Sequence, residues 1–151
     1  MLRTRISPSG KRLDVAGAKT VVPLASSAST TSATFVGVSG IAVSVDVSPG
    51  QVYLVRYDAE LEVGGGGPVA PAFRVYDTDL SSVVSNTSRY IASGIPLAFG
   101  ARWGTSGAGL ITIGSGRSSL NLALQWKSDG SSTIVGQSSS GGMLLSVERL
   151  S

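Results

Sequence analysis

The side chains of this chain that are best suited to chemistry are three acids, Asp58, Glu60 and Glu62. They occupy alternate positions, so on an extended strand they share one face and follow one another at roughly 7 Å. Paired carboxylates can serve as general acid and base in glycoside hydrolysis. The competing interpretation is the solvent face of an amphipathic strand, balanced by Arg56 and a cross-strand Arg74. Because catalytic pairs are rare, we favour the solvent face.

Other routes to catalysis are closed by composition. Cysteine and histidine are absent, which excludes thiol nucleophiles and zinc–thiolate sites and removes the commonest general base. A nucleophilic serine would need a lysine base, and no lysine stands in a Ser-x-x-Lys context. The glycine run at 64–67 lacks the Lys-Ser/Thr that completes a phosphate loop. We therefore expect no enzyme activity, no cofactor and no metal site.

Alternation of apolar and polar residues indicates the elements that would position these groups. In residues 52–63 the odd positions are apolar, and the even positions from 56 to 62 are charged, which predicts one long half-buried strand. No window has a convincing helical period. Turn sequences such as Ser48-Pro49-Gly50 and Asp129-Gly130 separate the strands. Strands are expected at residues 20–24, 34–37, 41–47, 52–63, 70–77, 95–103, 108–114, 119–127, 132–137 and 143–149.

This pattern predicts an all-β fold, an antiparallel jelly roll or a related sandwich. A length of 151 residues corresponds to one domain. The strand at 143–149 is expected to be central, because a free terminal strand would fray. Glycines at 107, 109, 114 and 116 indicate turns or close backbone contacts. We find no run of about 18 apolar residues and no secretion signal, so we expect a soluble protein made in a cytoplasm and not bound to membrane.

Positive charge is concentrated at the N-terminus. Residues 1–19 carry five basic side chains and one acid, a net charge of +4, whereas the other residues carry seven basic and eight acidic groups, a net charge of −1. We divide the chain into an extended basic arm, 1–19, and a β domain, 20–151. The arm could dock on a protein, remain solvated, or contact phosphates; it has no aromatic residue to stack on bases, so no nucleic acid is expected. The docking residues expected in the arm are Leu2, Arg3, Arg5, Ile6, Lys11, Arg12 and Leu13.

Several of the strand and turn sequences resemble virion proteins of tailed bacteriophages. The resemblance covers about residues 34–150 and lies in the segments Ser39–Ile41 through Tyr53–Tyr57, Leu120–Trp126 and Leu144–Leu150. In those proteins a Pro-Gly-x-x-Tyr turn, a Leu-x-Leu-Gln-Trp strand and a closing Leu-x-Val-Glu strand belong to jelly rolls similar to tumour-necrosis-factor (TNF) and C1q heads. Such patterns describe strands and turns and are not catalytic signatures.

The resemblance implies a homotrimer whose subunits pack apolar strand faces around a threefold axis. Core packing is the default for large side chains on these faces, but within the trimer hypothesis they become interface candidates: Tyr53, Tyr57, Leu122 and Trp126. The implied function is a capsid decoration (cement) protein bound to the major capsid protein, with the arm as the docking element and the virion as its location. The alternatives are a minor tail, tail-tip or fibre protein, and a carbohydrate- or receptor-binding module.

Overall fold

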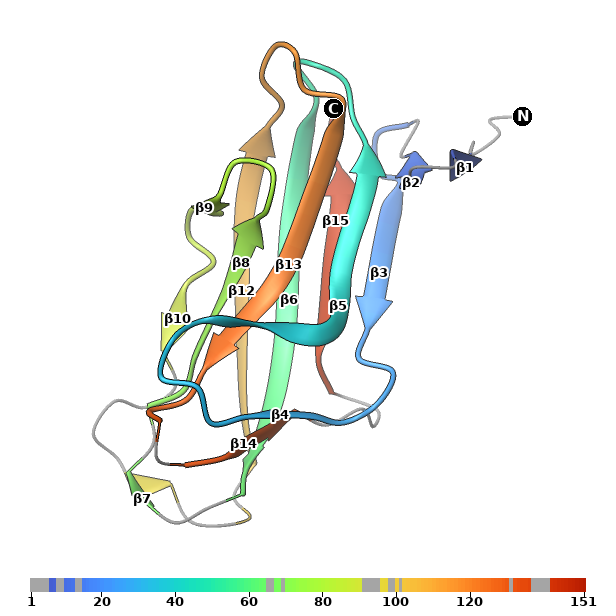
Figure 1. Ribbon diagram of the computed structural model, residues 1–151. Helices are drawn as coiled ribbons and strands as arrows, with labels where there is room; N and C mark the ends of the chain where they lie inside the picture. The colour runs from blue at the N-terminus through green and yellow to red at the C-terminus, as the bar shows by residue number, and fades with distance from the viewer. Residues whose placement is uncertain are drawn as a thin grey trace.

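A computed structural model describes residues 6–7, 10–12, 15–64, 67–68, 70–90, 96–97, 100, 102–130, 132–136 and 142–151. All regular structure in these residues is β. Two sheets face each other, and Figure 1 shows β5, β13 and β8 lying in front of β6, β12 and β15. A short third pairing joins β11 (Pro96–Leu97) to β7 (Gly67–Pro68).

The front sheet has the order β1-β2-β5-β13-β8-β10, with β9 also paired to β8. Its pairings are antiparallel except for β2 with β5, which is parallel. The bounds of its strands are β1 Ile6–Ser7, β2 Gly10–Arg12, β5 Val36–Asp46, β8 Ala72–Asp77, β9 Ser82–Val83, β10 Arg89–Tyr90 and β13 Ser119–Lys127.

The back sheet has the order β3-β15-β6-β14-β4, and β12 pairs with β6 along its opposite edge, from Val52 to Glu62. All of its pairings are antiparallel. The bounds of its strands are β3 Lys19–Pro23, β4 Ala28–Thr30, β6 Val52–Val63, β12 Arg102–Thr112, β14 Ile134–Gly136 and β15 Leu144–Arg149. As expected, the last strand is central, since β15 lies between β3 and β6.

The long strands alternate between the sheets in chain order. β5, β8 and β13 belong to the front sheet, whereas β6, β12 and β15 belong to the back sheet, and the first strand of the back sheet pairs with the last. This order confirms the predicted antiparallel jelly roll. It also explains the period-two sequences, because each strand presents one face to the opposite sheet and one to solvent.

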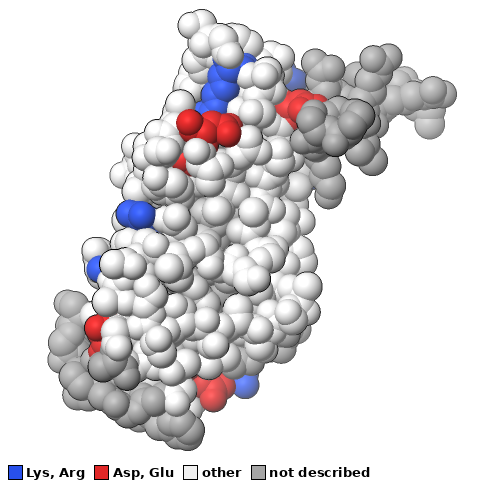
Figure 2. Space-filling model, viewed as in Figure 1, with Lys and Arg blue, Asp and Glu red and all other residues white. Residues whose placement is uncertain are grey.

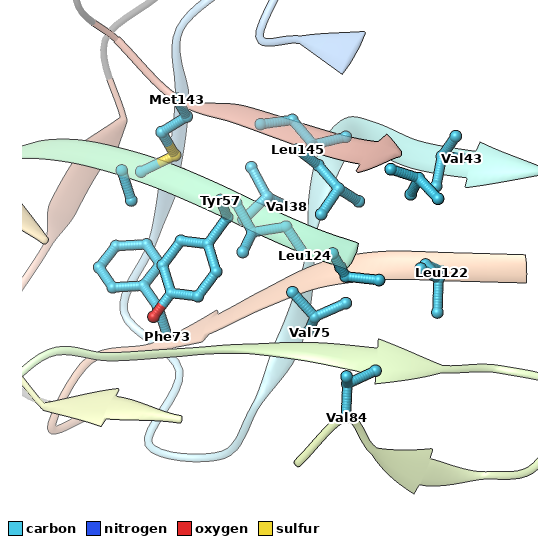
Figure 3. Close-up of a cluster of buried hydrophobic side chains, with 14 of the residues drawn as sticks. Val38, Val43, Tyr57, Phe73, Val75, Val84, Leu122, Leu124, Met143 and Leu145 are labelled. Carbon is cyan, nitrogen blue, oxygen red and sulfur yellow. The ribbon is translucent and has the colours of Figure 1, made fainter. Parts of the chain in front are cut away.

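The core lies between the sheets. In β6 and β13 every second residue is buried, in register with the alternation in the sequence. Figure 3 shows Tyr57 from β6 beside Phe73 from β8, with Leu124 and Leu145 further along the same layer. The ring centroids of Tyr57 and Phe73 are 6.2 Å apart, and those of Phe73 and Trp126 are also 6.2 Å apart. The core is therefore closed within one chain.

Two of the expected strand boundaries are wrong. The segments 34–37 and 41–47 belong to one strand, β5, which bends where Gly40 has φ of 82° and where the register with β13 shifts. Residues 102–112 also form one strand, although Gly104, Gly107 and Gly109 lie within it. A Cβ at Gly107 would meet the Tyr57 ring, and one at Gly109 would meet the Ser85 carbonyl. These two glycines therefore serve close backbone contacts, which was one of the two predicted roles.

Candidate functional site

The three acids considered for chemistry lie on the solvent side of β6. Arg102 of the neighbouring strand β12 lies 3.8 Å from Glu60 and 3.5 Å from Glu62, between a guanidinium nitrogen and a carboxylate oxygen. The prediction that Arg74 balances these acids across strands is wrong, because Arg74 lies on β8, which belongs to the other sheet. In the part of the chain that the structure describes, no group of three or more His, Cys, Asp or Glu side chains could hold a metal ion. These acids form a charged solvent face.

The four interface candidates do not lie on the surface. Tyr53 and Tyr57 have no exposed area, and Leu122 and Trp126 are 1% exposed. Each faces the opposite sheet of its own chain. Alternation in the sequence shows that one face of a strand is covered, but it does not show whether a second sheet or a second chain covers it. In the single chain these four residues are core residues, and a second copy cannot contact them without opening the sandwich.

The hydroxyl group of Tyr57 shows how this core handles a polar group. It donates a hydrogen bond of 2.9 Å to the Thr87 carbonyl, and the Thr87 hydroxyl in turn donates to the Val84 carbonyl at 2.7 Å. Burial raises the pKa of Tyr57 to about 12, and the nearby Arg89 guanidinium opposes this increase. The sequence around Thr87 gave no sign of this bridge, which joins residues thirty positions apart.

Replacing Tyr57 with phenylalanine should lower the free energy of unfolding by about 1 kcal/mol at pH 7, through loss of this hydrogen bond. The pKa of the folded-state hydroxyl lies above the ordinary value of 10, so its contribution is complete below pH 10 and is lost as pH rises through about 12. The difference between the wild type and Tyr57→Phe should therefore shrink between pH 10 and 12. Urea unfolding at both ends of this range measures it, and a constant difference would contradict the assignment.

The predicted docking arm is only partly described. Lys11 and Arg12 of β2 pair with Val45 and Asp46 of β5, and Ile6 of β1 pairs with Lys11. The arm therefore reaches the edge of the front sheet at β5, as Figure 1 shows. Leu2, Arg3, Arg5 and Leu13 lie outside the described residues. Docking by the arm stays a prediction.

The outward side of the back sheet carries several exposed large apolar side chains. We call it the β6 face and define it by Val21, Leu54, Arg56, Asp58, Leu110, Leu144 and Leu150. Two rows of paired residues cross it: Lys19, Glu148, Leu54 and Leu110, then Val21, Ser146, Arg56 and Ala108. Leu110 is 60% exposed, Val21 is 45% exposed and Leu150 is 42% exposed. Solvated leucine and valine side chains on one sheet face indicate an interaction surface.

Two charges on the β6 face lack partners. Among the described residues, neither Arg56 nor Asp58 takes part in a salt bridge. Both line a hollow of about 420 Å³ at the β12 edge, together with Arg89 and Ser106. The face therefore combines apolar side chains with charged ones, and Arg56 and Asp58 are among those that form no salt bridge within the described residues.

A second polar cluster lies at the end of the sandwich where β8 ends and β13 begins. Arg117 donates to Asp77 at 2.8 Å and to Asp79 at 3.3 Å, and Asn121 donates to Asp79 at 2.8 Å. The Asn121 hydrogen bond, more than Arg117, lowers the pKa of the Asp79 carboxyl. Asp77 also accepts bonds from the backbone N–H groups of residues 79 and 80. This arrangement ties two loops together, and its charges are already satisfied internally.

Figure 2 shows the front of the molecule, over β5, β13 and β8. Charged side chains gather at the upper end and along the margins, and the middle of this face carries none. In the described part of the chain no helix is long and apolar enough to cross a membrane.

Comparisons with known proteins yield distant structural likenesses. No family model matches, and no curated protein matches. Among solved structures, the infectious bursal disease virus VP2 subviral particle matches with a TM-score of 0.46 and 12% identity, over 100% of this chain and 42% of that chain. The Eiger TNF of S. frugiperda matches with a TM-score of 0.43 and 11% identity, over 83% and 92%. The enzymatically active domain of bacteriophage CBA120 tailspike protein 4 has a TM-score of 0.26 and 13% identity, over 87% and 19%.

This chain spans only about two fifths of the length of the VP2 chains that it matches. Because all three TM-scores are below 0.5, the jelly-roll assignment rests on the strand order and not on these matches.

Proposed function

We propose that this chain is a structural virion protein of a tailed bacteriophage, a homotrimeric decoration protein that binds the major capsid protein lattice. The observation that carries the proposal is the β6 face, where Leu110 and Val21 stand exposed on the outward side of the back sheet. Copies of the chain would bury this face against one another. The strand sequences that resemble phage virion proteins support a threefold arrangement. In this proposal the chain is not an enzyme and takes no cofactor.

The unpaired charges of the β6 face support self-association. Arg56 and Asp58 are two positions apart on β6, so their side chains lie in adjacent rows of the same face. Around a rotation axis the Arg56 guanidinium of one copy can meet the Asp58 carboxylate of the next. Such pairing gives each charge a salt-bridge partner that it lacks among the described residues of the single chain.

Replacing Leu110 with glutamate should convert the trimer to monomers, because it places three carboxylates in the apolar part of the interface. Analytical ultracentrifugation at micromolar concentration measures the mass. The matched control is Leu80→Glu, since Leu80 is 63% exposed but lies in the turn after β8. The control should stay trimeric. A wild-type protein that is monomeric under the same conditions would overturn the proposal.

Location on the particle is tested separately. An antibody against the chain should label the heads of intact virions in electron microscopy. An Arg3→Glu, Arg5→Glu variant should remain trimeric but lose its place on the head, because the arm would supply the contact. Labelling confined to the tail would replace decoration with the minor-tail alternative, and absence from particles would exclude both.

A further inference from the structure

The outward side of the front sheet carries a row in which aromatic rings and cations alternate. The order is Tyr76, Arg74, Phe35, Lys127 and Tyr90. The Arg74 guanidinium carbon is 5.3 Å from the Tyr76 ring centroid and 3.9 Å from that of Phe35. The Lys127 ammonium is 5.3 Å from the Phe35 centroid and 5.5 Å from that of Tyr90. We call these five residues the β8 row.

The strand register explains this arrangement. Arg74 of β8 pairs with Gln125 of β13, and Ala72 of β8 lies between Lys127 of β13 and Tyr90 of β10. Because Ala72 is small, the lysine side chain can reach the tyrosine ring across it. Phe35 precedes β5, in the segment that crosses in front of β13 in Figure 1. Three strands and one crossing segment thus bring together residues that are far apart in the sequence.

Arg74 is held in a fixed orientation. Its Nε donates a hydrogen bond of 2.8 Å to the Gln125 side-chain carbonyl, and its flat faces contact rings. The four N–H bonds of its two terminal nitrogens have no protein acceptor among the described residues. The unused N–H donors of this guanidinium can bind a carboxylate. Because the plane of the group is already fixed, binding would cost little further side-chain entropy.

No acid of the described part of the chain neutralises this row. Neither Arg74 nor Lys127 forms a salt bridge there. The acids of β6 lie on the other sheet, and Asp79 is held by Arg117 and Asn121 at the upper end. The row therefore presents two positive charges that form no salt bridge within the described residues.

The rings restrict the class of ligand. Phe35 has both cations against it, Tyr76 has Arg74 and Tyr90 has Lys127, but Tyr90 ends the row and is 61% exposed. Single-stranded nucleic acid binds through successive open rings. One open ring beside a fixed guanidinium and an ammonium suits a smaller unit, a sugar whose C–H face packs on Tyr90 and whose carboxylate meets the cations.

We propose that the β8 row binds carboxylate-bearing oligosaccharides, with Arg74 and Lys127 as the anion site and Tyr90 as the stacking ring. This site lies on the opposite sheet from the β6 face, so it does not depend on trimer formation. A monomeric protein could still bind the sugar, and a trimer that binds none would leave the proposed function intact.

The test is isothermal titration calorimetry of the full chain with tetragalacturonate in low-salt buffer. Maltotetraose serves as the neutral sugar and a ten-nucleotide oligo-dT as the polyanion without carboxylates. The variants are Arg74→Met, which removes the charge, Arg74→Lys, which keeps the charge but not the planar fork, and Tyr90→Ala. Arg102→Gln is the matched control, because Arg102 is an exposed arginine on the other sheet.

We expect one tetragalacturonate per chain, with affinity falling about tenfold in Arg74→Lys and further in Arg74→Met, and no change in Arg102→Gln. Tyr90→Ala should weaken binding without altering the fold, since the ring is exposed, and this variant keeps the test valid if Arg74→Met fails to fold. Equal affinity for oligo-dT, unchanged affinity in Arg74→Lys and Tyr90→Ala, or no detectable tetragalacturonate binding would each overturn the proposal.

Discussion

Replacing Trp126 with alanine should lower the free energy of unfolding by about 3–5 kcal/mol, the range found when large aromatic side chains are removed from cores. Trp126 is 1% exposed, pairs in register with Phe73 and has its ring against the Phe73 ring. Its removal leaves a cavity between the sheets that neighbouring strands cannot fill. Urea unfolding followed by circular dichroism, at one fixed protein concentration, measures the loss.

This experiment also separates a core role from an interface role for Trp126. The comparison variant is Tyr90→Ala, which removes an exposed ring and should change the free energy of unfolding by less than about 0.5 kcal/mol. A Trp126→Ala protein with unchanged unfolding but a smaller mass in solution would restore the interface hypothesis that the structure contradicts.

Replacing Arg117 with methionine should cost about 3 kcal/mol, because it leaves a buried carboxylate without its counter-charge. The Asp77 side chain is 4% exposed and that of Arg117 is 12% exposed, and their closest atoms are 2.8 Å apart. Arg117 also donates to the Ser119 carbonyl at 2.8 Å, so the loop before β13 loses an anchor as well. The same urea unfolding assay reports this change.

A second substitution tests the reason for the loss. Adding Asp77→Asn to Arg117→Met removes the unpaired charge but keeps the side-chain oxygen that accepts bonds from the backbone of residues 79 and 80. The double variant should therefore recover part of the stability. If it is less stable than Arg117→Met alone, the buried charge is not the cause.

Sequence periodicity was sufficient for the fold because a strand alternates its faces locally. The stretches that became β6 and β13 each show this alternation without reference to any other part of the chain. The jelly roll then follows from many such strands with short turns between them. The same alternation could not tell whether a second sheet or a second chain covers the apolar face. Core packing is its default prediction for Tyr53 and Trp126, and only the resemblance to trimeric proteins made them interface candidates.

The wrong strand boundaries within β12 and the wrong partner for the acids of β6 have a common physical origin. The Tyr57 ring leaves no space for a Cβ at position 107, and the Ser85 carbonyl leaves none at position 109. Both contacts depend on how β12 packs against the rest of the fold. The pairing of Arg102 with Glu62 likewise depends on the register of two strands forty residues apart. The β8 row is assembled from four segments of the chain, so no local motif could have revealed it.

The parallel pairing of β2 with β5 has a consequence for any receptor of the N-terminal arm. Gly10–Arg12 covers part of β5, the outermost long strand on that side of the front sheet. The backbone of β5 would otherwise be open to pairing with other chains. A partner protein that pulled these residues away would have to supply replacement hydrogen bonds to β5, or this edge of the sheet would be open to aggregation. Any docking by the arm would thus be linked, through the backbone of Gly10–Arg12, to the protection of this sheet edge against aggregation.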